Sequence, residues 1–153
     1  MADWNDSGSN PVTPKQALLT MRIVWAALLA GECLFMATTV LMILPHQRKP
    51  EHPQPILVWI NLGMLLTVIP VAFAIRRIIF GRFRANGILS STAYSMGNII
   101  FWAGCEGVAF FGVVVAIVNG SIWPTLVNVA VAMALQVVTF PLADKLSVTS
   151  TTT

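Results

Sequence analysis

Two glutamates lie deep inside apolar stretches of this 153-residue chain, and their side chains are the ones best placed to do chemistry. Glu32 is near the middle of a stretch from about residue 18 to 44, and Glu106 is near the middle of one from about 96 to 118. An ionised carboxylate at the centre of a bilayer costs about 2.5 kcal/mol or more. Each glutamate must therefore face a polar interior, find a hydrogen-bond donor or stay protonated. Both are proton-carrier candidates.

These two apolar stretches run in the same direction through the predicted membrane, so the two carboxyl groups lie at similar depth. If the helices pack together, the carboxyls meet and share a proton, because like charges in contact cannot both ionise. Four other polar residues are candidates for an outward approach to the glutamates: Thr38, Thr39, Asn61 and Asn128. The alternative is that each amide makes one interhelical hydrogen bond worth on the order of 0.6 kcal/mol and does nothing else.

The composition predicts the membrane that these stretches cross. The chain is 56% hydrophobic and 10% charged, with a mean hydropathy of +0.77, whereas soluble domains are roughly 25% charged. We therefore predict an all-α membrane protein, a four-transmembrane-helix bundle over residues 18–143, because each crossing needs about 20 apolar residues. The predicted spans are about 18–44, 56–75, 96–118 and 121–143, between a polar tail at 1–17 and a disordered polar tail at 144–153.

Special residues mark the ends and bends of these spans. Pro70 is expected to kink the second span, and Gly120 with its neighbour Asn119 to end the third. Three tryptophans fall near the predicted membrane interfaces, where an aromatic belt places them: Trp25, Trp59 and Trp123.

Basic residues predict the orientation in the membrane. With four spans, seven lie on the side of both termini: Lys15, Arg22, Arg76, Arg77, Arg82, Arg84 and Lys145. Only Arg48 and Lys49 lie on the other side, so the positive-inside rule places both termini in the cytoplasm. The four arginines from 76 to 84 are also candidates for binding anionic lipid headgroups. No basic run contains the interleaved aromatics of a nucleic-acid site, so no nucleic-acid partner is predicted.

Small residues recur four positions apart in the first and third spans. The pairs are Ala27 and Gly31, Ala103 and Gly107, and Gly112 and Ala116. This spacing allows two helix backbones to approach closely, so we predict that these are helix-packing residues.

Motifs for enzymatic chemistry are missing from the sequence. There is no nucleophile with a matching base, no glycine-rich phosphate loop and no histidine within a span. His46 and His52, with Glu51 nearby, match no recognised metal-ligand spacing, and the two cysteines form no metal or disulfide pattern. We therefore predict neither an enzyme nor a protein with a metal or cofactor.

Two resemblances centre on Glu106. The pattern W-x3-E-G-x-A-x-F-G, made by Trp102, Glu106, Gly107, Ala109, Phe111 and Gly112, resembles the third helix of small four-span bacterial inner-membrane proteins of unassigned function. That resemblance implies a bacterial inner-membrane location. The segment EGVAFFGVVVAIV is similar to the carboxylate-bearing helix of rotary ATPase c-type proteolipids, which implies an ion-carrying glutamate. The other helix of that family has a glycine at every second residue, whereas residues 56–75 contain only Gly63.

Two functions follow from these observations. The first is an accessory or assembly subunit that packs against itself or a larger membrane complex, with the lipid bilayer and other membrane subunits as its partners. The alternative is a proton or cation relay that uses Glu32 and Glu106 as reversible carriers.

Overall fold

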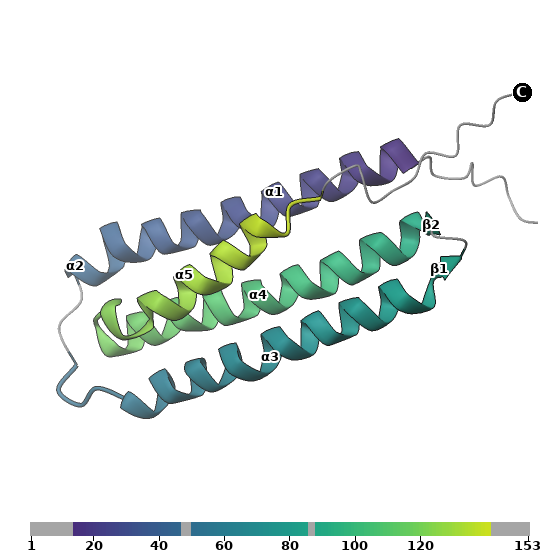
Figure 1. Ribbon diagram of the computed structural model, residues 1–153. Coiled ribbons are helices and arrows are strands. Elements are labelled where there is room, and N and C mark those ends of the chain that lie inside the picture. The colour runs from purple at the N-terminus through teal and green to yellow at the C-terminus, as the bar shows by residue number, and fades with distance from the viewer. Residues whose placement is uncertain (1–13, 47–49, 86–87, 142–153) are drawn as a thin grey trace, which may run out of the picture.

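A computed structural model describes residues 14–46, 50–85 and 88–141 (Figure 1). Four helical segments account for most of these residues: α1 (Pro14–Thr38), which continues through the π-helical turn η1 (Thr39–Ile43) into α2 (Leu44–His46), then α3 (Pro55–Arg82), α4 (Ser91–Asn119) and α5 (Trp123–Val138). Two antiparallel strands of two residues each, β1 (Arg84–Ala85) and β2 (Ile88–Leu89), lie between α3 and α4.

The helices form a bundle in which α4 is central. It packs against α1, α3 and α5, and it contributes more buried side chains than any other helix of the described chain. The helices α1 and α4 run in one direction, and α3 and α5 run in the other (Figure 1). We call the end where α1 begins and α3 finishes the basic end. The predicted all-helical bundle is thus confirmed, together with the shared direction of the two glutamate-bearing helices.

Three of the helical segments are long and apolar enough to cross a membrane: Lys15–His46, Pro55–Arg82 and Ser91–Asn119. The fourth helix, α5, has 16 residues, which corresponds to about 24 Å, less than the roughly 30 Å of a hydrocarbon core. It is therefore shorter than the span predicted at 121–143. The other three are longer than predicted.

Local hydrogen bonds explain these boundaries. The Ser90 hydroxyl accepts a hydrogen bond from the backbone N–H of Ala93, so α4 begins at Ser91 rather than near residue 96. At the end of α5 the Thr139 hydroxyl donates back to the Leu135 carbonyl, and the helix cannot continue because Pro141 lacks a backbone N–H and crowds the preceding turn. At the C-terminal end of α4, Gly120 adopts a left-handed φ of 63°, as predicted for the end of the third span.

The arginine-rich segment lies beyond the span predicted at 56–75, but most of it is helical. Helix α3 continues without interruption through Pro70 and on to Arg82, so that Arg76, Arg77 and Arg82 are helical and only Arg84 lies in a strand. Arginine is a good helix former, and nothing between Ile75 and Gly81 breaks the backbone pattern.

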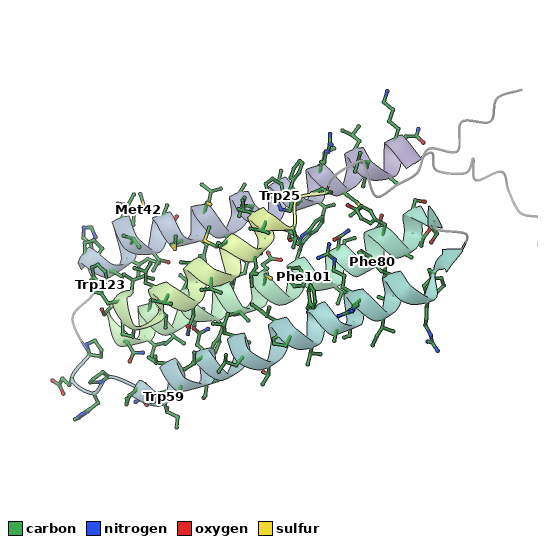
Figure 2. All side chains as sticks on the ribbon, in the orientation of Figure 1. Trp25, Met42, Trp59, Phe80, Phe101 and Trp123 are labelled. Atoms are coloured by element: carbon green, nitrogen blue, oxygen red, sulfur yellow. The ribbon has the colours of Figure 1, made fainter. Side chains whose placement is uncertain are left out.

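Aromatic side chains separate into interior and exterior groups. Trp102 is fully buried on α4 and donates a hydrogen bond to the Thr139 hydroxyl. Trp59 and Trp123 project away from the bundle, 69% and 77% exposed, as a membrane-interface belt requires (Figure 2). Trp25 is different, because it is half-buried and donates to the Gln136 carbonyl over 2.8 Å. This bond connects α1 to α5 near the basic end.

Candidate functional site

Glu32 is the most deeply buried acid of the described chain, only 3% exposed. It lies on the face of α1 that is turned toward α4 and α5, and the amide nitrogen of Gln136 on α5 donates a 2.5 Å hydrogen bond to its Oε1. The other carboxyl oxygen, Oε2, is buried without a partner, and so is Oε1 of Gln136. Glu32 and Gln136 are thus joined by one hydrogen bond, and each has one acceptor oxygen that is buried without a donor.

The space beside the Glu32 carboxyl is apolar and narrow. Its walls come from three helices: Phe35 of α1, Ala109, Phe110 and Val113 of α4, and Val129 and Met133 of α5. The rings of Phe35 and Phe110 lie 5.1 Å apart, and the remaining space is too small for a water molecule. Glu32 therefore has no water-filled route along this side of the bundle.

Glu106 lies on α4 and is half-buried. It interacts electrostatically with Glu32, so the packing of α1 on α4 does bring the two carboxyl groups near each other. Within the described residues Glu106 forms no hydrogen bond or ion pair, and none joins it to Glu32. Sharing of a proton between them stays a prediction.

The predicted supporting residues divide into two places. The Asn128 amide nitrogen donates to Asn61 Oδ1 over 2.8 Å, and the Asn61 nitrogen donates to the Val108 carbonyl over 3.0 Å. Both asparagines are buried, and together they join α3, α4 and α5. Thr39 is buried in the first turn of η1 with an unpartnered hydroxyl, whereas Thr38 is exposed. No hydrogen bond links the threonines to the asparagines in the part of the chain that the structure describes.

The three small-residue pairs also have different environments. Gly112 and Ala116 are buried, and a Cβ atom at Gly112 would lie 2.7 Å from Val129 Cγ2, so this pair packs inside the bundle. Ala27, Ala103 and Gly107 are exposed, and a Cβ at Gly31 or Gly107 would meet nothing within 4 Å. The pairs Ala27 and Gly31, and Ala103 and Gly107, therefore have no helix of the described chain packed tightly on them.

The arginines lie at the basic end. Arg77 and Arg82 are exposed on α3, whereas Arg76 is half-buried. Its guanidinium lies over the rings of Phe80 and Phe101, 5.2 Å and 5.5 Å from their centroids. Figure 2 shows these two rings between α3 and α4.

Gln136 was not among the predicted site residues, although it is the hydrogen-bond partner of Glu32. A signal for it exists in the sequence, since Gln136 and Asn128 are eight positions apart, on nearly one face of α5. The buried residues Val129 and Ala132 share that face, so an amide there is expected to point into the bundle.

No protein-family model, curated protein or solved structure matches this chain. The resemblance of the Glu106 segment to small four-span bacterial proteins, and its likeness to the proteolipid helix, therefore stay predictions.

Proposed function

We propose that this chain is a multi-pass protein of the bacterial inner membrane that serves as an accessory or assembly subunit. Its four helices lie across the bilayer with the basic end in the cytoplasm, and the bilayer thins locally at α5, which is shorter than the hydrocarbon core. This orientation is supported by Lys15 and Arg22 on α1 and by the arginines of α3, which all lie at one end of the bundle. The arginines and lysines in the connection from α2 to α3 are only two, Arg48 and Lys49. The partner is a transmembrane helix of another subunit.

One observation carries the proposal: the central helix is uncovered along one side. A stripe of α4, which we call the α4 outer face, is exposed at Met96, Ile99, Ala103, Gly107, Val114 and Val118. The other helices cover the rest of α4, but nothing in the described chain covers this stripe. A helix at the centre of a bundle that leaves one apolar side open has a surface suited to a further helix.

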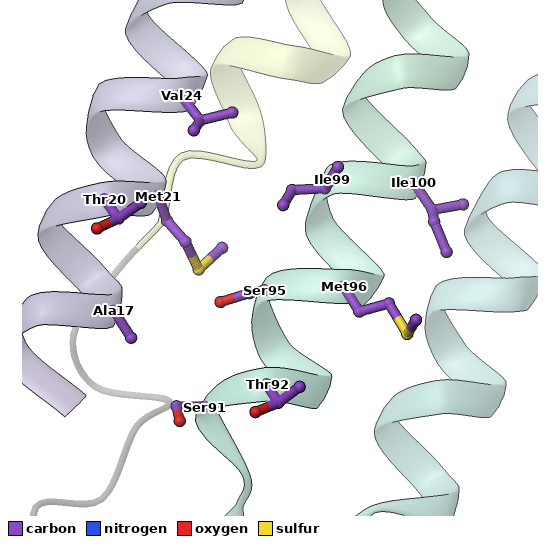
Figure 3. A pocket seen from close by; sticks show the side chains of 10 residues that line it. All are labelled: Ala17, Thr20, Met21, Val24, Ser91, Thr92, Ser95, Met96, Ile99 and Ile100. Carbon is purple, nitrogen blue, oxygen red and sulfur yellow. The ribbon is translucent and has the colours of Figure 1, made fainter. Parts of the chain in front are cut away.

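Hollows flank the α4 outer face on both sides. One of about 620 Å³ lies between α1 and α4 near the basic end, with Met21 and Val24 on one wall and Ser95 and Ile99 on the other (Figure 3). A second of about 350 Å³ lies between α3 and α4, and Ile100 borders both. Side chains of a partner helix crossing α4 would fill these hollows, as ridges fit grooves between packed helices.

Small residues let the partner approach closely. Ala103 and Gly107 lie in the middle of the α4 outer face. On α1, Ala27 and Gly31 continue the row of Thr20 and Val24 that borders the larger hollow. Without bulky side chains at these points, dispersion contacts between backbones supply the attraction that lipid cannot.

A pair of glycine substitutions tests the proposal. Gly107 on the α4 outer face and Gly63 on α3 are both helical and exposed, and a Cβ at either meets nothing within 4 Å. Gly107→Leu and Gly63→Leu therefore start from equally open positions. A photo-crosslinking residue at Ala103 in native membranes should give a discrete protein adduct, which Gly107→Leu reduces about fivefold and Gly63→Leu leaves unchanged, since lost packing of about 1 kcal/mol changes binding by that factor.

Two results would contradict the proposal. One is an Ala103 crosslinker that labels lipid alone, because the face would then have no protein on it. The other is equal loss of the adduct in both glycine variants, because the effect would not be specific to the α4 outer face.

As a second candidate function we propose a proton or cation relay. It is favoured by the electrostatic interaction between buried Glu32 and half-buried Glu106, which gives an inner and an outer carboxyl on neighbouring helices. The relay also needs a route onward from Glu32, and the apolar contacts of Phe35 and Phe110 fill that side. The two functions differ in whether Glu32 must exchange a proton.

A further inference from the structure

Arg76 has an environment unlike that of the other arginines on α3. Its guanidinium lies over the rings of Phe80 and Phe101, and its side chain borders a hollow of about 310 Å³. The lining of this hollow is aromatic at both ends and basic between them, with Phe73, Arg76, Arg77 and Phe80 on one face of α3. The site thus combines two positive charges with an apolar wall.

The charge of Arg76 has no counterion within the described residues. Its Nε is buried and has no hydrogen-bond partner. The acids of the described chain are Glu32, Glu51 and Glu106, and none of them forms an ion pair with it. Because a guanidinium stays charged in proteins, a half-buried one without a carboxylate is costly unless some anion pairs with it.

The two rings hold the guanidinium in a fixed position. Stacking on Phe80 and Phe101 restricts its motion. A guanidinium has parallel N–H groups at the spacing of two phosphate oxygens, the geometry in which arginine binds phosphate most strongly. Arg77 lies one residue further on, exposed, and supplies a second positive charge.

The position along α3 indicates where the anion comes from. Arg76 is six residues before the end of α3, about 9 Å from it, so it lies at the depth of lipid headgroups if α3 crosses the membrane. Toward the middle of the helix, Phe73 extends the hollow with an exposed apolar surface. The hollow is therefore charged toward the end of α3 and apolar toward the middle of the helix, which matches a lipid phosphate followed by an acyl chain.

We propose that this hollow binds an anionic phospholipid of the cytoplasmic leaflet, with the phosphate held by Arg76 and Arg77 and an acyl chain against Phe73. The inference rests on the membrane placement in the proposed function, but not on the partner helix at the α4 outer face. Bound lipid supplies the counterion that Arg76 lacks within the described chain.

Lipid retention in native mass spectrometry tests this site. The full chain is reconstituted in nanodiscs with equal phosphatidylglycerol and phosphatidylcholine, then released with its bound lipids. We expect the wild type to retain phosphatidylglycerol preferentially, and Arg76→Gln to lower this preference about fivefold, as loss of a charge-assisted bidentate contact predicts. Arg82→Gln is the matched control, because it removes the same charge from an exposed position outside the hollow.

Further arms separate the alternatives. Arg76→Lys keeps the charge but loses the planar nitrogen edge, so it should show an intermediate preference, and it replaces Arg76→Gln if that variant fails to fold. Equal losses in Arg76→Gln and Arg82→Gln would overturn the site in favour of a diffuse positive surface. Absence of any preference in the wild type would also overturn it. Displacement of the lipid by millimolar inorganic phosphate would identify a free phosphate as the ligand and overturn the lipid assignment.

Discussion

Two polar clusters join the helices of this bundle, and they differ in how completely their hydrogen bonds are made. In the first, Asn128 donates to Asn61, which in turn donates to the Val108 carbonyl, so every interhelical contact pairs a donor with an acceptor. In the second, Gln136 donates to Glu32, and one acceptor oxygen on each residue is left without a partner. Both clusters are buried and both include α5.

The difference shows which cluster is complete as it stands. Two amides can satisfy each other because each has donors and acceptors, whereas an ionised carboxylate beside an amide has acceptors in excess. A proton on Glu32 turns one of the two unpaired acceptors into a donor, and the pair can then close with a second hydrogen bond. The Asn61 and Asn128 cluster thus serves as a structural link, and the Glu32 and Gln136 cluster is the one able to take up a proton.

The largest effect is expected from placing an acid in the complete cluster. Asn61→Asp removes the donor to the Val108 carbonyl and adds a buried carboxyl that no described basic residue accompanies. We expect the free energy of unfolding to fall by about 2.5 kcal/mol, the cost of an acid within a membrane helix. Steric trapping in bicelles measures this free energy. If Asn61→Asp lowered the unfolding free energy less than a Glu32 variant does, the two clusters would not differ as proposed.

A smaller effect is expected from removing one amide of the same cluster. Asn128→Leu keeps the branched shape and the number of heavy atoms but leaves Asn61 Oδ1 buried without its donor. The expected loss is about 1 kcal/mol, within the range for interhelical hydrogen bonds in membranes. Val127→Leu, at an exposed neighbouring position, is the control and should change the unfolding free energy little. An equal loss in both variants would mean that the hydrogen bond contributes nothing measurable.

Sequence reasoning predicted the elements of the bundle better than the partners inside it. The long apolar stretches were enough to predict the helices and the shared direction of α1 and α4, since each stretch is set by local composition. The extension of α3 through Arg76 and Arg77 does not follow from the apolar stretch, which ends at residue 75, although arginine favours helix.

Contacts between helices were harder to predict because they depend on how each helix is rotated about its axis. Spacing identified all three small-residue pairs, but not that Gly112 packs on Val129 while Gly107 remains uncovered. The approach of the two glutamates was predicted from their shared depth. Gln136 was not predicted as the donor to Glu32, because that contact depends on the rotation of α5. Only packing decides which residues on opposite helices share a level and a side.

The smallest effect is expected from making the incomplete cluster resemble the complete one. In Glu32→Gln the new amide can donate to Gln136 Oε1, which now lacks a partner, while its own oxygen still accepts from the Gln136 nitrogen. The unfolding free energy should therefore change by no more than about 0.5 kcal/mol.

Because a glutamine side chain carries no exchangeable acid proton, the same variant also separates the two proposed functions. A relay predicts that proton flux into reconstituted vesicles is abolished in Glu32→Gln and equally in Glu106→Gln, whereas an assembly subunit predicts vesicles indistinguishable from wild type and an unchanged Ala103 crosslink. A loss of stability as large as that of Asn61→Asp would show that Glu32 is held as an ionised group by contacts other than Gln136, and the contrast between the clusters would fail.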